Sequence, residues 1–379
     1  MAWGGDPPVA FRMPTSPLRT FLYVRSWMTG RADVRTWDIV LDRDGVPVPA
    51  TLVMPASAQA PVPAWVVLHG ITRPGREHRQ LVRFTHAVAE GGAAVLVPEV
   101  PEWRELDLAP RVTVPSILAC LEALDGLPHL VAPRRVGLVG FSFGAPQVLR
   151  ASVHPALRGR LAGVVGFGGY FDLERTLVFQ FTGRHEWKGE RHALRPDPYG
   201  RWIAGANYLT SVPGYADAGE VASGLRRLAA AAGDLGVVAW DARFDADKEA
   251  IRRTISPPRR PLFDLFAPAS DRDPDPVAGE EMAHQLAAAA RRAEPTIEPG
   301  PILGDLEGPV HLMHGRHDRL IPFSEMLRLV EALPEGVLAN AVVTRLFAHS
   351  SRDPLPGWRE GAREVTAFLK ALSGLLGVV

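Results

Sequence analysis

The sequence predicts an α/β protein with a mostly parallel central sheet of about eight strands and a mostly helical insertion. Short segments made almost entirely of apolar residues recur along the chain, as expected for parallel strands that are buried on both faces. Segments with helical spacing, such as 78–91 and 116–124, lie between them. This alternation indicates a parallel sheet with right-handed crossovers. Buried strands are expected at 64–68, 93–97, 136–141, 163–167, 309–313 and 341–347.

Two further strands are expected before the first buried one. Residues 37–42 alternate between apolar and polar, Asp44-Gly45 is a hairpin turn signal, and 50–54 is the returning strand. Strand signals then become sparse from about 171 to 305, a stretch too long for an ordinary loop. We therefore expect an N-terminal lead-in at 1–36, an α/β core at 37–170 and 306–379, and a helical cap insertion at 171–305.

Composition and charge exclude several classes of protein. The 379 residues are 46% hydrophobic and 22% charged, which is typical of a folded globular chain. Lys+Arg and Asp+Glu both number 42, so no net positive charge favours a nucleic-acid partner. The single cysteine, Cys120, excludes an intrachain disulfide. It lies in an apolar run, where a buried thiol is expected.

The sequence also bears on the location of the protein. Residues 1–8 lack the pattern of a secretory signal, and no apolar stretch approaches the roughly 20 residues that span a bilayer. We therefore expect a cytoplasmic protein with no membrane span. The sequence leaves the oligomeric state open, a homodimer included.

The segment Gly140-Phe141-Ser142-Phe143-Gly144 carries the strongest chemical signal. It follows a predicted strand and precedes a helical run. A serine in a sharp strand-to-helix turn is held in a strained backbone conformation with its hydroxyl exposed above the sheet, and small flanking residues let the turn close. The bland alternative is a glycine-rich turn with a structural serine. The strand–turn–helix context favours Ser142 as a nucleophile.

A serine nucleophile needs a base, and that base needs an orienting carboxylate. Asp318 follows the predicted strand 309–313, and His349 follows the strand 341–347. The order Ser142, Asp318, His349 is the one expected for a nucleophile elbow of this kind. Asp318 could instead be a loop carboxylate paired with a neighbouring arginine, and His349 could be a surface histidine. Three matching residue types, each after its own strand, favour a triad.

An oxyanion site is expected beside the elbow. The backbone N–H of Phe143 should supply one donor. His69-Gly70 ends an early core strand, so the second donor should be the N–H of Ile71 or of Thr72. His69 itself is interpreted as structural, bracing this loop.

The segments 64–170 and 306–372 resemble the α/β-hydrolase superfamily of serine hydrolases. The resemblance rests on the elbow, on His69-Gly70, on His314-Gly315 followed by Asp318, and on the late His349. It implies an α/β-hydrolase fold with Ser142 as nucleophile, His349 as general base and acid, and Asp318 as the orienting acid. No cofactor is implied. The insertion lies where the family often carries a cap, and cap sequences do not reveal the substrate.

Two alternatives concern the site itself. Asp172 follows the strand 163–167, and some members of the superfamily place the acid there. Asp318 is preferred because His-Gly-x-x-Asp fits its position. His311, His314 and His317 raise the question of a metal, but residues three apart on a strand point to opposite faces, so no metal site is expected.

Eight aromatic residues lie between 167 and 203. They suggest that the cap lines an apolar pocket for an acyl or aromatic group, although core packing explains any one of them. The pocket candidates are Phe141, Tyr170, Phe179 and Trp187. We therefore expect a carboxylesterase-like serine hydrolase acting on a small-molecule ester. An amide or peptide hydrolase on the same core, and a non-catalytic binding protein with this fold, are the alternatives.

Overall fold

The computed structural model describes residues 16–58, 61–132, 135–346 and 358–379. His349, the expected general base, lies outside the described residues. Within the described ranges, none of the helices has the length and apolar character needed to cross a bilayer.

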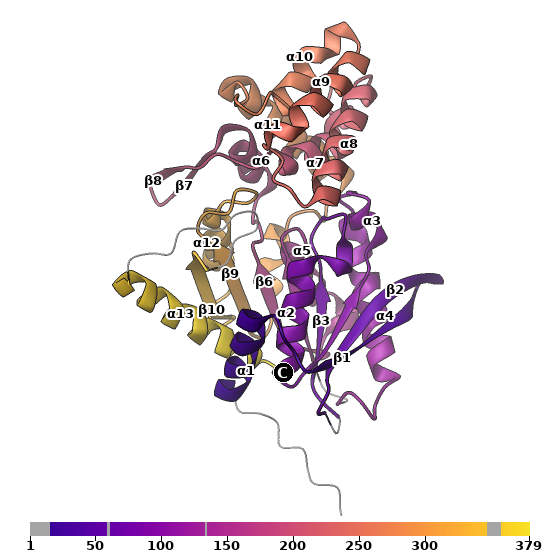
Figure 1. Ribbon diagram of the computed structural model, residues 1–379, viewed down its shortest axis with the longest axis vertical. Helices are drawn as coiled ribbons and strands as arrows, with labels where there is room; N and C mark the ends of the chain where they lie inside the picture. The colour runs from indigo at the N-terminus through magenta and orange to yellow at the C-terminus, as the bar shows by residue number, and fades with distance from the viewer. Residues whose placement is uncertain (1–15, 59–60, 133–134, 347–357) are drawn as a thin grey trace, which may run out of the picture.

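An eight-stranded, mostly parallel sheet forms the centre of the molecule, as the sequence predicted (Figure 1). Strand β2 runs antiparallel to both of its neighbours, β1 and β4, and all other neighbouring strands are parallel. In spatial order the strands are β1 (Val34–Arg43), β2 (Val46–Pro55), β4 (Ala94–Pro98), β3 (Ala64–Leu68), β5 (Val136–Phe141), β6 (Leu161–Phe167), β9 (Val310–Gly315) and β10 (Leu338–Thr344).

Helices cover both faces of this sheet. On one face α1 (Ser16–Thr29), α2 (Arg79–Glu90) and α13 (Trp358–Leu376) bury residues such as Phe84 and Leu372 against alternate strand residues. The other face carries α4 (Thr113–Asp125), α5 (Gly144–Ser152) and α12 (Phe323–Ala332). Coverage of both faces explains why the parallel strands are continuous apolar runs.

Six further helices lie beyond one end of the sheet, in the upper part of Figure 1. They come from the segment between β6 and β9, and their buried side chains are continuous with one of the two core clusters. We call this group of helices the cap. It consists of α6 (Leu173–Thr182), α7 (Pro198–Tyr208), α8 (Gly219–Leu235), α9 (Asp245–Thr254), α10 (Arg260–Phe266) and α11 (Pro276–Ala293).

The segment between β6 and β9 also contains a small hairpin that the sequence did not reveal. Strands β7 (Arg184–Trp187) and β8 (Glu190–Ala193) pair antiparallel around a turn at Lys188-Gly189. Both strands are mostly charged or polar and only partly buried, so they lack the apolar alternation that marks a strand. The short helix α3 (Pro101–Arg104) follows β4.

Candidate functional site

Ser142 lies between the end of β5 and the start of α5, in a strained backbone conformation. Its φ is +53°, which is rare for a residue with a side chain. Two hydrogen bonds fix the turn: the Ser142 N–H donates to Phe167 O over 2.7 Å, and the Ala145 N–H donates to Ser142 O over 3.0 Å. The backbone geometry is therefore that of a nucleophile elbow.

The two glycines that flank the elbow are required by close backbone contacts. A Cβ atom on Gly140 would lie 2.2 Å from the carbonyl oxygen of Gly144. A Cβ atom on Gly144 would lie 2.9 Å from the carbonyl oxygen of His69. A larger residue at either position would force the backbone of this turn apart, which explains the two glycines in the sequence pattern.

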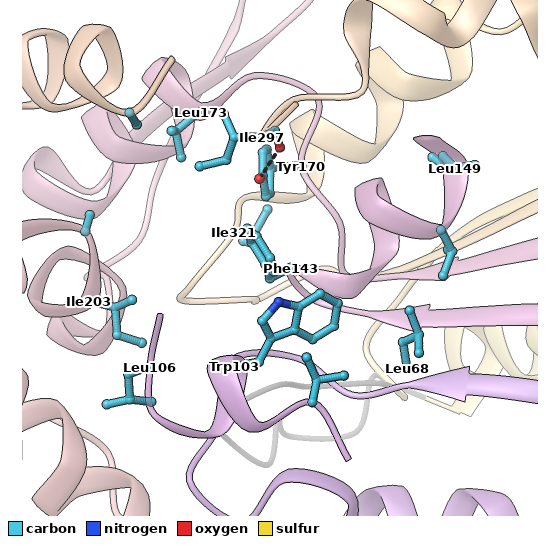
Figure 2. Packing of buried hydrophobic residues seen from close by; sticks show 14 of the residues in the cluster. Leu68, Trp103, Leu106, Phe143, Leu149, Tyr170, Leu173, Ile203, Ile297 and Ile321 are labelled. Carbon is cyan, nitrogen blue, oxygen red and sulfur yellow. Dashed lines mark hydrogen bonds between the residues drawn. The ribbon is translucent and has the colours of Figure 1, made fainter. Parts of the chain in front are cut away.

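A cavity of about 90 Å³ opens beside Ser142, between the sheet and the cap. Figure 2 shows Phe143, Ile321, Tyr170 and Ile297 close together, with Leu173 beside Tyr170 and Ile297 and with Ile203 on the opposite side. The lining is Ile71, Leu108, Ser142, Phe143, Tyr170, Leu173, Thr176, Leu177, Gln180, Tyr199, Gly200, Ile203, Ala204, Ile297, Leu320 and Ile321.

Several polar side chains in this lining donate hydrogen bonds to backbone carbonyl oxygens. The Tyr170 hydroxyl donates to Ile297 O over 2.6 Å, the bond drawn in Figure 2. The Thr176 hydroxyl donates to a main-chain oxygen over 2.8 Å, and the Gln180 amide donates to Leu320 O over 3.1 Å. A bound molecule therefore meets a mainly apolar wall next to the Ser142 hydroxyl.

Of the four predicted pocket residues, Tyr170 lines this cavity and the other three lie elsewhere. Phe141 stacks on Phe167 at 4.8 Å, on the sheet face covered by α2. Phe179 is fully buried and contacts His185. Trp187, in strand β7, carries Lys188 and Arg328 against its ring. Phe141 faces away because side chains alternate along a strand, and it shares the face of Val139.

The loop after β3 lies directly against the elbow. A Cβ atom on Gly70 would lie 3.0 Å from the Ser142 Cβ. Ile71 lines the cavity together with Ser142 and Phe143, whereas Thr72 does not line it. The carbonyl oxygen of Thr72 accepts the N–H of Gly75 in a tight turn. Of the two residues considered for the second oxyanion donor, Ile71 is thus the one beside the serine.

Asp318 is buried in the turn after β9. Its Oδ1 accepts the N–H groups of Leu320 (2.8 Å) and Ile321 (3.1 Å), while its Oδ2 lies 3.4 Å from His314 Nε2. His314 Nε2 also lies 2.9 Å from Ile321 O. These contacts fix the carboxylate and the turn that presents it.

Asp172, the competing acid, occupies a different environment. Its side chain caps α6 by accepting the N–H of Arg175 over 2.8 Å, and its other oxygen lies 3.3 Å from Arg291 of α11. Asp172 therefore serves as the N-terminal capping residue of α6 and forms an ion pair with α11. Glu325 of α12 accepts the Asp172 N–H over 2.8 Å, which joins this segment to the core.

The three histidines that raised the question of a metal lie in and just after β9. His311 and His314 are buried in β9, and His317 lies half-buried in the following turn. In the part of the chain that the structure describes, no three His, Cys, Asp or Glu side chains form a group that could hold a metal ion. Cys120 is buried in α4, where desolvation raises the pKa of its thiol.

Two residues next to the site escaped sequence reasoning. Trp103 of α3 is fully buried and packs edge-on against both Phe143 (5.3 Å) and His69 (5.8 Å). Glu99 follows β4 and lies 3.1 Å from His69 Nε2. Glu99 could have been found from its position at the carboxyl end of a buried strand, because the functional sites of parallel sheets lie at that edge.

No protein-family model and no curated protein matches this chain. Among solved structures it is similar to the 2,6-dihydroxy-pseudo-oxynicotine hydrolase, at 17% identity over 93% of this chain and 71% of that one, with a TM-score of 0.47. It is similar to brefeldin A esterase, a bacterial homologue of human hormone sensitive lipase, at 17% identity over 98% and 87%, with a TM-score of 0.46. Est1E from Butyrivibrio proteoclasticus matches at 15% identity over 89% and 96%, with a TM-score of 0.44.

Similarities at such low identity say nothing about the activity of this chain. Its fold can instead be identified from its own strand order and from the elbow at Ser142. A mostly parallel eight-stranded sheet, with its second strand antiparallel and a strained serine between its fifth strand and the next helix, is the architecture of the α/β-hydrolases. The chain therefore has the α/β-hydrolase fold.

Proposed function

We propose that this protein is a serine hydrolase that cleaves a carboxylic ester through an acyl-enzyme. The observation that carries the proposal is the strained elbow at Ser142, which opens on a mainly apolar cavity. Strain of about 1–3 kcal/mol at one residue persists where the surrounding structure holds it, and such residues cluster at active sites. The buried Asp318, in the turn after β9 and two strands away from β5, supports a triad.

The proposed reaction has two halves. His349 takes the proton of the Ser142 hydroxyl as its oxygen attacks the ester carbonyl, and the N–H groups of Phe143 and Ile71 stabilise the oxyanion. The tetrahedral intermediate collapses, and the alcohol leaves with the proton from His349. Water then attacks the acyl-enzyme in the same way and releases the acid. Asp318 holds the imidazole of His349 in the productive orientation.

The cavity supports an apolar acyl or aromatic group in the substrate. Leu173, Leu177 and Ile203 of the cap line it together with Ser142. The Tyr170 hydroxyl and the Gln180 amide, which also line it, donate to backbone carbonyls. A charged or sugar substrate would lose its hydration there and would find few polar partners in return. We therefore expect short apolar and small aromatic acyl groups to be preferred over charged ones.

The proposal is tested with a panel of p-nitrophenyl esters of short, long and aromatic acids, plus one aryl amide. Wild type should hydrolyse the short and aromatic esters, and Ser142→Ala should reduce turnover to background. Ser152→Ala is the matched control, because Ser152 ends the helix that follows Ser142 and donates to Leu149 O, away from the cavity. Faster cleavage of the amide than of every ester would favour a peptidase. Equal activity of wild type and Ser142→Ala would contradict the proposal.

A further inference from the structure

The first turns of α7 line two separate spaces. Gly200 and Ile203 line the cavity beside Ser142, whereas Pro198 and Arg201 line a smaller cleft of about 10 Å³. Helix α9 and the segment between α10 and α11 contribute the other walls of this cleft. A space of this size holds about one water-sized group. The cleft therefore belongs to the cap and lies on a different face of α7 from the cavity.

Positive charge dominates the lining of the cleft. It contains one acidic side chain, Asp273, and four basic ones, which are Arg195, Arg201, Lys248 and Arg272. Arg195 Nε lies 2.8 Å from Asp273 Oδ1, and Lys248 Nζ lies 3.0 Å from Oδ1 of Asp245. Even with Asp245 included, four cations therefore face two carboxylates.

Arg201 is a buried cation without a carboxylate partner. Its side chain is 3% exposed, and Nε and Nη1 donate to Phe266 O (2.7 Å) and Gln180 O (2.9 Å). Among the residues that the structure describes, Nη2 has no hydrogen-bond partner and no carboxylate lies within 4.0 Å of the guanidinium. The two carbonyls belong to the last turns of α10 and α6, whose dipoles offset part of the charge. The remaining charge is costly to bury.

The neighbouring cations add to this cost. Burial lowers the pKa of Arg201 to about 10, and Arg195 lowers it further, against the attraction of Asp197 and Asp273. Lys248 is 5% exposed. Burial lowers the pKa of its ammonium, and Arg201 and Arg195 act in the same direction, against Asp245. Three cations thus repel one another where little water screens them, and a bound anion would relieve this repulsion.

We propose that this cleft binds a tetrahedral oxyanion such as phosphate, with Arg201 and Lys248 as its buried partners. Nη2 of Arg201 keeps both of its hydrogens for an oxygen of the anion, and guanidinium groups suit phosphate oxygens. One oxygen fills the cleft, and the others remain at its mouth beside Arg195 and Arg272, which are both exposed. The site goes beyond the proposed ester cleavage, because no step of that reaction uses it.

Titration calorimetry with inorganic phosphate tests the site, with the ionic strength held constant by sodium chloride. Lys248→Gln should weaken the binding of phosphate at least about tenfold, because it removes a buried charge while keeping a donor for Asp245. Arg252→Gln is the matched control. Arg252 lies on the same helix and pairs with Asp264 (2.7 Å), but it does not line the cleft. This variant should bind phosphate as wild type does.

Asp273→Asn should change the affinity in the opposite direction. It removes the acidic side chain of the lining and releases Arg195, so phosphate should bind several-fold more tightly. A substitution that only loosened the cap would weaken binding instead. Thermal unfolding with and without phosphate checks that each variant folds, and the asparagine variant decides the matter if Lys248→Gln does not fold.

Two sources of the oxyanion are distinguished by a parallel titration with glycerol 3-phosphate. Affinity equal to that of inorganic phosphate indicates that the cleft accepts the end of a phosphate monoester, and weaker binding indicates a site for the free ion. Binding of phosphate that Lys248→Gln leaves unchanged, or wild type that binds no phosphate, would overturn the proposal. Arg201 would then serve only to cap α6 and α10. Since binding is measured without an ester, failure of the proposed hydrolysis would leave this result untouched.

Discussion

The hydroxyl of Tyr199 lies 3.5 Å from the carbonyl oxygen of Ile71, and it joins the cap to the loop beside Ser142. A second link lies next to it, since Arg73 Nε is 3.1 Å from Asp234 of α8. The cap therefore contacts the loop that supplies the proposed oxyanion donor, besides closing the cavity. We therefore expect a change in the cap to affect the proposed catalysis without altering the proposed triad.

Tyr199→Phe removes one of these links. We expect kcat to fall a few-fold, because the peptide that follows Gly70–Ile71 loses a constraint. Tyr208→Phe, in the same helix, removes a hydroxyl that donates to Leu108 O over 3.1 Å and does not line the cavity. Each loss should cost about 1 kcal/mol of stability. Steady-state kinetics and urea unfolding measure both effects, and an equal fall in kcat for the two variants would refute the link.

Replacing Ser142 with glycine should abolish activity and stabilise the fold. Glycine adopts the φ of +53° without strain, which relieves about 1–3 kcal/mol, while its extra freedom in the unfolded chain costs about 0.5–1 kcal/mol. We expect a net gain of about 1 kcal/mol in urea unfolding. Ser142→Ala keeps the strain and should show no such gain. A glycine variant no more stable than the alanine variant would mean that the turn is not strained.

The two candidate acids should respond differently to loss of charge. Asp318→Asn should reduce kcat by up to about 10,000-fold, the loss seen when the orienting acid of a triad is neutralised. Asp172→Asn should retain turnover, because asparagine also caps a helix and the contacts of Asp172 are with the cap. Steady-state kinetics on one ester compare the two variants. The reverse ranking would make Asp172 the acid of the triad.

Asp197 should make part of the stability depend on pH. It caps α7, accepts the N–H of Tyr199 over 3.0 Å, and is buried, which raises its pKa to about 6. A raised carboxyl pKa means that the folded chain binds the proton more tightly than the unfolded chain. The contribution of Asp197 to the free energy of unfolding is therefore present below about pH 4 and is lost as the pH rises to about 6.

Asp197→Asn removes this titration. The free energy of unfolding of wild type, minus that of the variant, should fall by about 2 kcal/mol between pH 4 and pH 6 and then level off. Urea unfolding across this range measures the difference, and subtraction cancels the other carboxyl groups. A difference that stays flat or rises with pH would show that burial does not govern Asp197.

The parts of the molecule that could be predicted are those encoded locally. The elbow is a short segment at a strand–helix junction, so Ser142 and its glycines could be recognised from adjacent residues. The parallel strands could be recognised as continuous apolar runs because helices cover both faces of the sheet. Asp318 could be placed because it follows a strand in a recognisable turn.

The parts that could not be predicted depend on contacts between distant segments. Glu99 contacts His69 although the two are 30 positions apart in the sequence, and nothing in either segment indicates this contact. The cavity wall comes from α6, α7 and the loop at Ile297, whose packing the helical pattern does not specify. Two rings of the aromatic-rich stretch, those of Tyr170 and Tyr199, line the cavity, whereas the others lie in the sheet core, in the hairpin or in the interior of the cap. His349 lies outside the described residues, so its role stays a prediction.

Direct trapping of the acyl-enzyme tests the central claim, that Ser142 is the nucleophile. The protein is mixed with a short p-nitrophenyl ester, quenched in acid within the first turnover, digested and analysed by mass spectrometry. The account predicts a burst of p-nitrophenol and an acyl group on the peptide that carries Ser142, both absent from Ser142→Ala. An acyl group on any other residue, or turnover by Ser142→Ala at the wild-type rate, would contradict it.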